Sequence, residues 1–257
     1  MLAEQRRTAI LEILGEKGAV TVNELHRRLQ VSRETVRRDI TRLATEQKLR
    51  KTHGGALIMD HVEPAFADRM EVNIAGKRAI GQKAAELVPD GASLVIDSGT
   101  TTLCLAEALA PRRSLNVFTN DIHVASCLAG RNDNGVILFG GELQGTEGAT
   151  LGRDTTACLD NYFTDFCFVG ASALNADPML SDFSREAAEF RAQMIVHART
   201  SVLLADHTKF NKRAPVRVEN LDQVTHIVTD GKLGSALTKA LGRLSAEIIT
   251  ARVKDKT

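Results

Sequence analysis

Short apolar runs alternate with segments of helical periodicity between residues 77 and 257, and this pattern limits the fold more than any other feature. Buried parallel strands read as short continuous apolar runs, and each parallel pair needs a helical crossover. The expected strands are Ser93–Ile96, Asn116–Thr119, Val136–Phe139, Phe166–Gly170, Val202–Ala205 and Ile227–Thr229. The expected helices are Lys77–Val88, Thr101–Leu109, Ile122–Leu128, Thr155–Asn161 and Arg185–His197. The pattern predicts an α/β fold, with a Rossmann-like, mainly parallel sheet covered by helices on both faces.

Ligands of such sheets bind beyond the carboxyl ends of the strands, so the residues after each strand form the candidate site. Five strand ends carry small, hydroxyl-bearing or charged residues that we expect to converge on an effector. They are Asp97, Ser98, Gly99, Thr100, Thr101 and Thr102; Thr119, Asn120 and Asp121; Gly140, Gly141 and Glu142; Gly170 and Ala171; and Asp206 and Lys209.

The loop after the first strand is the most specific of these candidates. Its glycine lets backbone amides converge, its hydroxyls add donors, and the next helix offers a positive N-terminus, which together form a phosphate cradle. The loop is not a P-loop, because that motif is absent. The other interpretation is an ordinary capped turn from strand to helix. Lys209 is the candidate cation for a phosphate, and Asp97, Asn120 and Asp206 are candidates for sugar hydroxyls.

The first 57 residues contain three closely spaced segments of helical periodicity. The first runs from about Ala3 to Glu16. The second opens with Thr21, whose hydroxyl can cap the helix while Glu24 completes a capping box. The third follows Ser32, a good N-cap, and continues to about residue 47. Two short capped helices joined by a brief turn predict a helix-turn-helix, whose second helix enters the major groove of DNA.

The outer face of the third helix is basic, and nine basic residues against three acidic ones lie between Arg27 and Lys51. The stretch Leu49–Leu57 contains Gly54-Gly55 and predicts a hairpin wing. A solvated helix face is the alternative for a basic cluster by itself, but here caps, basic face and wing coincide. For His53 a turn role and a phosphate contact remain equally open. The residues expected at DNA are Ser32, Arg33, Thr35, Arg37, Arg38, Arg42, Lys51 and His53.

Charge is distributed unevenly along the chain. Residues 1–57 hold 12 Lys and Arg against 7 Asp and Glu, whereas the remainder holds 21 against 25, so only the N-terminal part is suited to a polyanion. The absence of Trp and the single Tyr favour duplex DNA over unpaired bases. The four cysteines lack zinc-site spacing, so we expect reduced core thiols, no metal and no cofactor. No run is long enough to span a membrane, and a charged N-terminus predicts a cytoplasmic protein.

The stretch Ser32-Arg33-Glu34-Thr35-Val36-Arg37-Arg38-Asp39-Ile40, followed by the wing with His53-Gly54-Gly55, resembles the signature of the DeoR family of bacterial regulators. The similarity continues through the strand-end motifs. It implies a repressor of carbohydrate or polyol catabolism genes, with a sensor domain similar in fold to ribose-5-phosphate isomerase that reads a phosphorylated sugar or polyol. Within the motif we expect Asp39 to pair with a neighbouring arginine, because a carboxylate facing DNA would repel phosphate.

The resulting hypothesis is a switch made of a DNA-binding domain (1–57), a linker (58–76) and an effector-sensing domain (77–257). A dimer or tetramer would occupy operator DNA and leave it when the effector binds. The main alternative is a phosphosugar isomerase-like enzyme with an accessory DNA-binding domain, in which Asp97, Glu142 and Asp206 would transfer protons. No catalytic set at diagnostic spacing supports it. An architectural DNA binder is a third possibility.

Overall fold

The computed structural model describes residues 3–46, 48–52, 54–58, 63–145, 147–177 and 179–253. The chain forms two compact units that divide between Glu63 and Pro64. The segment predicted as a linker, 58–76, differs in the structure, because it contains helix α4 (Phe66–Glu71) and the start of α5 (Ile74–Ala85). Both helices belong to the second unit, where their apolar residues have a sheet to pack against.

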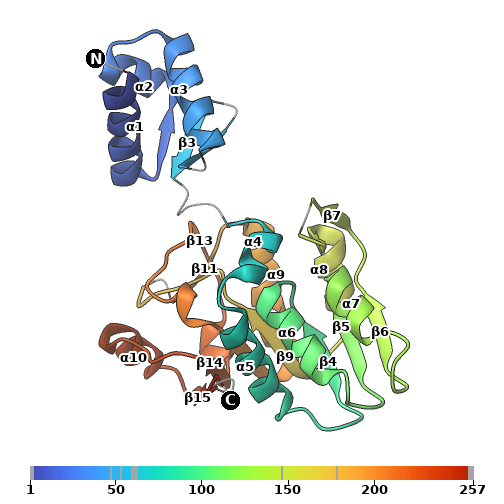
Figure 1. Cartoon of the computed structure of the whole chain (residues 1–257). Helices are drawn as coiled ribbons and strands as arrows, with labels where there is room; N and C mark the ends of the chain where they lie inside the picture. Colours follow the sequence, from blue (N-terminus) through green and yellow to red (C-terminus); the bar gives the residue numbers. More distant parts are fainter. Residues whose placement is uncertain are drawn as a thin grey trace. The chain divides into compact units, whose positions relative to one another are not determined.

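The first unit contains three helices and a three-stranded antiparallel sheet (Figure 1). These are α1 (Ala3–Lys17), α2 (Val22–Leu29) and α3 (Arg33–Thr45), with β1 (Ala19–Thr21), β2 (Leu49–Lys51) and β3 (Gly55–Ile58) in the order β1-β3-β2. The periodic apolar residues meet in one core that includes Ile10, Leu25 and Ile40. The unit is therefore a winged helix-turn-helix.

The predicted caps of α2 and α3 are present. The Thr21 hydroxyl accepts from the Glu24 amide at 3.1 Å, and the Ser32 hydroxyl accepts from the Thr35 amide at 3.1 Å. The second half of the predicted capping box is wrong, because the Glu24 carboxylate bonds to the ammonium of Lys17 on α1. A charged partner is a stronger donor than a backbone amide.

Gly55 is the first residue of the wing strand β3, where the backbones of β3 and β1 lie close together. A Cβ at this position would lie 1.9 Å from the Val20 carbonyl oxygen, which is backbone and cannot move aside. We therefore expect Gly55→Ala to lower the free energy of unfolding of the first unit by about 1–3 kcal/mol. Gly54→Ala is the matched control, because a Cβ there meets nothing within 4 Å. Urea denaturation monitored by circular dichroism would test this, and equal midpoints for the two variants would contradict it.

The second unit is built on a seven-stranded, wholly parallel sheet with the order β15-β14-β12-β9-β4-β5-β6. Its strands are β4 (Ser93–Ile96), β5 (Asn116–Thr119), β6 (Gly135–Leu138), β9 (Thr164–Gly170), β12 (Ala198–Leu204), β14 (His226–Thr229) and β15 (Glu247–Thr250). The six predicted strands are confirmed, with ends shifted by a few residues. The seventh, β15, was not predicted.

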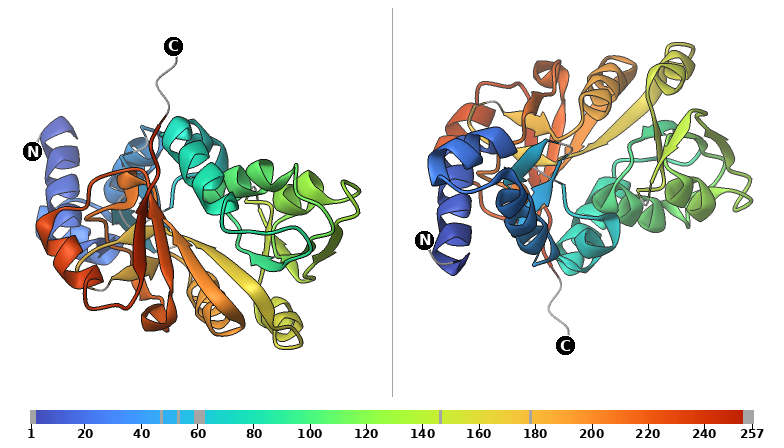
Figure 2. Two further views of the ribbon diagram at one scale, coloured as in Figure 1. Left: turned by 90° about the horizontal axis from the view of Figure 1, so that it is seen from below. Right: turned by 90° about the horizontal axis from the view of Figure 1, so that it is seen from above.

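Helices cover both faces of this sheet (Figure 2), and the buried side chains form two apolar cores. On β4, Leu94 and Ile96 face the core beneath α5, α6 and α7, whereas Val95 faces the core beneath α8, α9 and α10. The helices not yet given are α6 (Thr100–Leu109), α7 (Ile122–Leu128), α8 (Arg153–Leu159), α9 (Arg185–Val196) and α10 (Ser235–Leu241). The predicted α/β architecture is confirmed.

Smaller elements lie between the strands and helices of the second unit. They are the hairpin β7 (Glu142–Gln144) and β8 (Ala149–Leu151), the sheet of β10 (Ala173–Leu174), β11 (Leu180–Asp182) and β13 (Val216–Arg217), and the turns η2 (His207–Lys209) and η3 (Leu221–Gln223). None of the described helices is long and apolar enough to cross a membrane.

The chain order reverses between β4 and β9. From β4 the chain proceeds outward through β5 to β6, whereas from β9 it proceeds in the opposite direction through β12 and β14 to β15. The crossovers after β4 and β9 leave in opposite directions, so a crevice opens between their carboxyl ends, where open α/β sheets bind ligands. Asp97 follows β4 and Gly170 ends β9 at this point.

Candidate functional site

The outer face of α3 presents the cations expected at DNA. Arg33, Arg37, Arg38 and Arg42 are exposed, whereas Val36, Ile40 and Leu43 are buried. Arg33 and Arg38 have no ion-pair partner among the described residues. Asp39 pairs with an arginine as predicted, but the partner is Arg6 of α1 and not a neighbour in the motif. The buried carboxylate accepts from Arg6 at 2.5 Å, which turns it away from the DNA face.

The other predicted DNA contacts are partly engaged within the unit. Arg42 pairs with Glu46 at 2.7 Å, and hydrogen bonds from Arg42 and Lys48 lower the pKa of Glu46 to about 2. Arg37 lies 3.9 Å from Glu34. The Lys51 ammonium donates to the Thr41 hydroxyl at 3.1 Å, which fastens the wing to α3. The Ser32 and Thr35 hydroxyls bond to each other at 2.8 Å. His53 lies outside the described residues.

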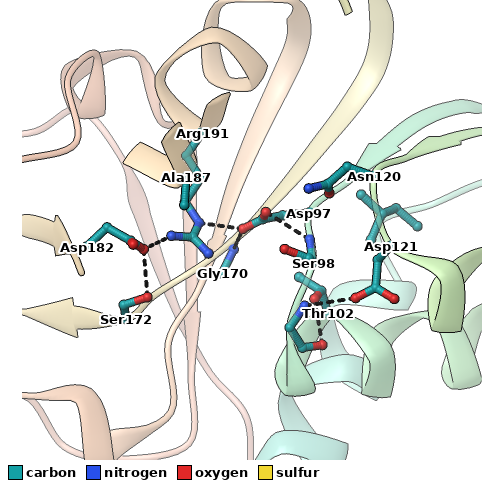
Figure 3. Close-up of polar contacts among 12 residues, drawn as sticks. Asp97, Ser98, Thr102, Asn120, Asp121, Gly170, Ser172, Asp182, Ala187 and Arg191 are labelled. Atoms are coloured by element: carbon teal, nitrogen blue, oxygen red, sulfur yellow. Dashed lines mark hydrogen bonds and ion pairs between the residues drawn. The ribbon is translucent and has the colours of Figure 1, made fainter. Parts of the chain in front are cut away.

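Asp97 lies at the centre of the crevice in the second unit, and both of its carboxylate oxygens accept hydrogen bonds (Figure 3). Oδ1 accepts from the Ser98 amide at 2.8 Å, and Oδ2 accepts from the Gly170 amide at 3.0 Å and from Nε of Arg191 at 2.6 Å. Asp97 therefore ties β4 to β9, and its contact with a sugar hydroxyl stays a prediction.

Arg191 of α9 was not predicted, although it organises the crevice. Its guanidinium also bonds to the buried carboxylate of Asp182, which in turn accepts from the Ser172 hydroxyl at 2.7 Å (Figure 3). One arginine thus neutralises carboxylates from β11 and from the end of β4. These partners lie 94 and 9 residues away along the chain, so no local pattern indicates them.

The N-terminus of α6 opens at the crevice without a cap. Gly99 is the N-cap residue, with φ 140°, and no side chain caps the helix. The Leu103 amide donates to the Gly99 carbonyl at 2.9 Å. The three preceding amides meet no acceptor in the described part of the chain, namely those of Thr100, Thr101 and Thr102. Three unpaired amides and the positive end of the helix dipole at one buried point favour an anion.

The residues after β5 hold this loop from its other side. Asp121 caps α7 and accepts from the Gly99 amide at 3.2 Å; burial raises the pKa of its carboxyl, and backbone hydrogen bonds oppose that shift. The Thr119 hydroxyl donates to the Ile96 carbonyl at 2.7 Å. Both side chains therefore shape the loop. Asn120 differs, because its Nδ2 donates to the Thr150 carbonyl at 2.9 Å while its fully buried Oδ1 has no partner among the described residues.

Asp206 follows β12, and only one of its two carboxylate oxygens accepts hydrogen bonds from described residues. Its Oδ1 accepts from the Thr208 hydroxyl at 2.6 Å and from Nδ2 of Asn73 at 3.3 Å. Its Oδ2 is buried and has no partner within the described chain. Asp206 and Asn120 therefore each present a buried, unpaired acceptor at the carboxyl edge of the sheet. A buried acceptor needs a donor, and a ligand hydroxyl supplies one.

Lys77 of α5 is a second residue that the sequence did not indicate. Its side chain is buried, and its ammonium donates to the Arg69 carbonyl but meets no carboxylate of the described residues within ion-pair distance. Burial lowers the pKa of Lys77, Asp206 opposes that shift, and Lys209 reinforces it. A buried cation that lacks an anionic partner is costly, so it marks a site for an anion.

Helix packing places Lys77 beside the uncapped end of α6. The two helices run in the same direction, since one precedes and the other follows β4. They touch at Gly81, where a Cβ would lie 2.6 Å from the Cys104 carbonyl. Lys77 lies one turn before Gly81, and Thr100 lies one turn before Cys104. The ammonium of Lys77 and the free amides of α6 therefore reinforce each other's attraction for an anion.

The remaining predicted residues divide between the crevice and the edge of the sheet. Gly170 bonds to Asp97 and lies in the crevice with Ala171 beside it. Gly140, Gly141 and Glu142 follow the edge strand β6 and are exposed, and no hydrogen bond between described residues joins them to Asp97. The structure therefore does not bring them together with the loop after β4, because β5 lies between β4 and β6.

Metal binding finds no support in the described residues, which contain no group of three His, Cys, Asp or Glu side chains able to hold an ion. The four cysteines are free thiols, and burial raises the pKa of Cys104 to about 11. A thiol of that pKa is protonated at neutral pH and acts as a small core side chain.

A winged helix-turn-helix with a basic recognition face, joined to an α/β unit with a candidate anion site at its strand ends, defines a DNA-binding transcription regulator with a sensor domain. Residues 6–62 match the DeoR-like helix-turn-helix domain, and residues 72–231 match the DeoR C terminal sensor domain. The chain belongs to the DeoR family.

Similar curated proteins are named as repressors. The chain is 32% identical over 231 residues to the glycerol-3-phosphate regulon repressor of Escherichia coli K12. The alignment covers 90% of this chain and 92% of that protein. It is 32% identical over 245 residues to the HTH-type transcriptional repressor CsqR of the same organism, with 95% and 94% covered. The HTH-type transcriptional regulator GolR of Listeria innocua is 31% identical over 248 residues, with 93% and 95% covered.

Among solved structures, ribose 5-phosphate isomerase A of Methanocaldococcus jannaschii aligns with a TM-score of 0.39 and 18% identity. The alignment covers 53% of this chain and 54% of that chain, or about half of the isomerase. This agreement is too low to transfer a fold or an activity, and the predicted likeness of the sensor domain to the isomerase remains a prediction.

Proposed function

We propose that this protein represses transcription by binding operator DNA through its helix-turn-helix unit, and that a phosphorylated sugar or polyol releases it. The observation that carries the proposal is the uncapped end of α6 beside the buried ammonium of Lys77. A phosphate would accept hydrogen bonds from the free amides of α6 and from Lys77, with Lys209 close by. Ligand hydroxyls would donate to the unpaired oxygens of Asn120 and Asp206.

The relatives support this effector class. Three of the proteins similar to this chain are named for glycerol 3-phosphate, a polyol phosphate with two free hydroxyls. That number matches the two unpaired acceptors of the site. At DNA, Arg33 and Arg38 would read bases or phosphates with Thr35 and Ser32 beside them, and two copies of the chain would meet two half-sites. The proposed location is the cytoplasm, where operator DNA lies.

The same geometry disfavours isomerase chemistry. Proton transfer needs a carboxylate with an oxygen free to reach the substrate. Both oxygens of Asp97 accept hydrogen bonds within the fold, and its pairing with Arg191 disfavours proton uptake, whereas Glu142 is exposed at the edge of the sheet. Asp206 keeps a buried oxygen without a partner among the described residues, which suits recognition of a hydroxyl.

A thermal-shift screen of sugar and polyol phosphates, each beside its unphosphorylated parent, tests the proposal. A true effector at about 100 times its Kd stabilises the protein by about 2.7 kcal/mol, which raises the Tm by roughly 5–10 °C. The parent compound should give little shift. Equal Tm shifts from both members of each pair would contradict the proposed phosphate site.

Lys77→Met gives a second test of the same site. Loss of one charged hydrogen bond should weaken binding of the phosphorylated compound roughly 10- to 150-fold in calorimetric titration. Lys83→Met is the matched control on the same helix, because the Lys83 ammonium is exposed and pairs with Glu86 at 2.6 Å. If the two variants bind the compound equally well, Lys77 is not part of the site.

A further inference from the structure

Helix α4 forms the first structured element of the second unit, two residues beyond the point where the units divide. Any signal that passes along the chain between the sensor domain and the DNA-binding unit therefore passes through it. With six residues, α4 is too short to be stable by itself, so its position depends on its contacts.

One set of contacts fastens α4 to the side of the sheet that carries β5. The Phe66 ring stacks on His123 of α7 with centroids 4.9 Å apart, and the buried guanidinium of Arg69 pairs with Glu147 in the β7–β8 turn. That hairpin also carries Thr150, whose carbonyl accepts from Asn120 at 2.9 Å. The proposed effector contact Asn120 is thus connected to α4 through a single hairpin.

A second set fastens the corner between α4 and α5 to the ends of β12 and β14. Asn73 adopts the left-handed conformation, with φ 52°, and donates to Oδ2 of Asp230 at 2.8 Å and to Oδ1 of Asp206 at 3.3 Å. Burial would raise the pKa of Asp230, but hydrogen bonds from Asn73 and His207 outweigh it and keep that pKa below its usual value. Gly76 lies so close that a Cβ would be 2.0 Å from Asp230 Oδ2. The corner has little freedom to shift.

Lys77 connects these contacts to the proposed effector site. Its ammonium bonds to the carbonyl of Arg69, in the last turn of α4, and so caps the C-terminus of this helix. The packing of Gly81 on Cys104 places Lys77 level with the first turn of α6, at its uncapped end. A phosphate is a stronger acceptor than a peptide carbonyl, so a bound phosphate would draw Lys77 away from Arg69.

We infer that Lys77 alternates between the C-terminus of α4 and the phosphate of the effector, and that α4 thereby conveys occupancy of the site toward the DNA-binding unit. This inference rests on the proposed function. Coupling requires that the ligand contact the two states differently, and exchange of one cation between two acceptors provides that difference. The effector would loosen α4 by removing its cap.

Hydrogen exchange of the full-length protein tests the first half of the inference. The probe is glycerol 3-phosphate, or the phosphorylated compound that gives the largest Tm shift in the screen. We expect the probe to speed exchange of the α4 amides roughly fivefold, the effect of losing one hydrogen bond. In Lys77→Met, α4 should exchange at the faster rate without the probe, and the probe should not change it. Unchanged exchange of α4 in the wild type with the probe bound would overturn the inference.

The variant Phe66→Ala tests the second half, because Phe66 anchors α4 without touching the effector site. Phe163→Ala is the control, since that ring is 69% exposed at the start of β9. The readout is the ratio of DNA Kd values with and without saturating probe, on a duplex selected from random DNA by the wild type. We expect Phe66→Ala to bind the probe within about threefold of wild type while this ratio falls toward one.

The outcomes separate the inference from the function on which it rests. If the probe binds and releases DNA equally well in Phe66→Ala and Phe163→Ala, α4 is not the coupling element, although the proposed function stands. If no phosphorylated compound shifts the Tm, the proposed function fails and the inference fails with it.

Discussion

Replacing Arg191 with methionine is expected to lower the free energy of unfolding of the second unit by about 3–5 kcal/mol. The guanidinium is 8% exposed and bonds to two carboxylates that are 1% and 2% exposed. Methionine fills a similar volume but leaves Asp97 and Asp182 charged, buried and unpaired. Such a loss is a large part of the stability of a typical domain, so the variant should unfold at a much lower urea concentration.

Arg185→Met is the matched control, because it removes an arginine from the same helix. Arg185 is 79% exposed and pairs with Glu189 at 2.7 Å, where water screens the pair. Its urea midpoint should equal that of the wild type. Similar midpoints for Arg191→Met and Arg185→Met would show that the buried ion pairs do not hold the crevice together. Partial recovery in Arg191→Met with Asp182→Asn would identify the unpaired charge as the cause.

The double variant Arg33→Ala, Arg38→Ala is expected to weaken binding to the selected duplex at least about 100-fold. Both side chains project from α3 into solvent and lack ion-pair partners in the described structure. They are therefore free to reach bases or phosphates. Fluorescence anisotropy at several salt concentrations would measure the loss, and each phosphate contact removed should reduce the salt slope by about 0.9.

Arg42→Ala separates a specific contact from a general effect of positive charge. Its guanidinium lies on the same helix but pairs with Glu46 at 2.7 Å. We therefore expect a loss of less than about tenfold. If Arg33, Arg38 and Arg42 contribute equally to DNA binding, the ion pair between Arg42 and Glu46 opens on DNA. The prediction that arginines without an ion-pair partner bind DNA more strongly is then wrong. Thermal melting would confirm that each variant is folded.

Features that depend on neighbours a few residues apart were predictable from the sequence. The caps at Thr21 and Ser32, the buried face of α3 and the six apolar strands belong to this class, because caps and periodicity are local. Strand ends were also predictable as a candidate site, since carboxyl ends of parallel strands share one edge. The loop from Asp97 to Thr102 was located in this way.

Only the tertiary structure decided which strand ends are neighbours and which side chains remain free. The sheet order puts β9 beside β4 and separates β6 from it, so Gly170 joins the crevice and Glu142 does not. Asp97 pairs with Arg191, a residue 94 positions away that no local pattern indicates as its partner. Lys77 has no distinguishing feature in the sequence, and only the packing of α5 on α6 buries it.

The physical reason is the range of the interactions. Helix caps and periodic faces are fixed by hydrogen bonds and packing within one or two turns, which the sequence displays directly. The partner of a buried charge is fixed by strand order and helix packing, which bring residues together regardless of their separation along the chain. The sequence by itself therefore determined the helix-turn-helix and the sheet edge at which we propose the sensor site. The tertiary structure decided that Lys77 is buried there and that Asn120 and Asp206 each keep a buried oxygen without a partner among the described residues.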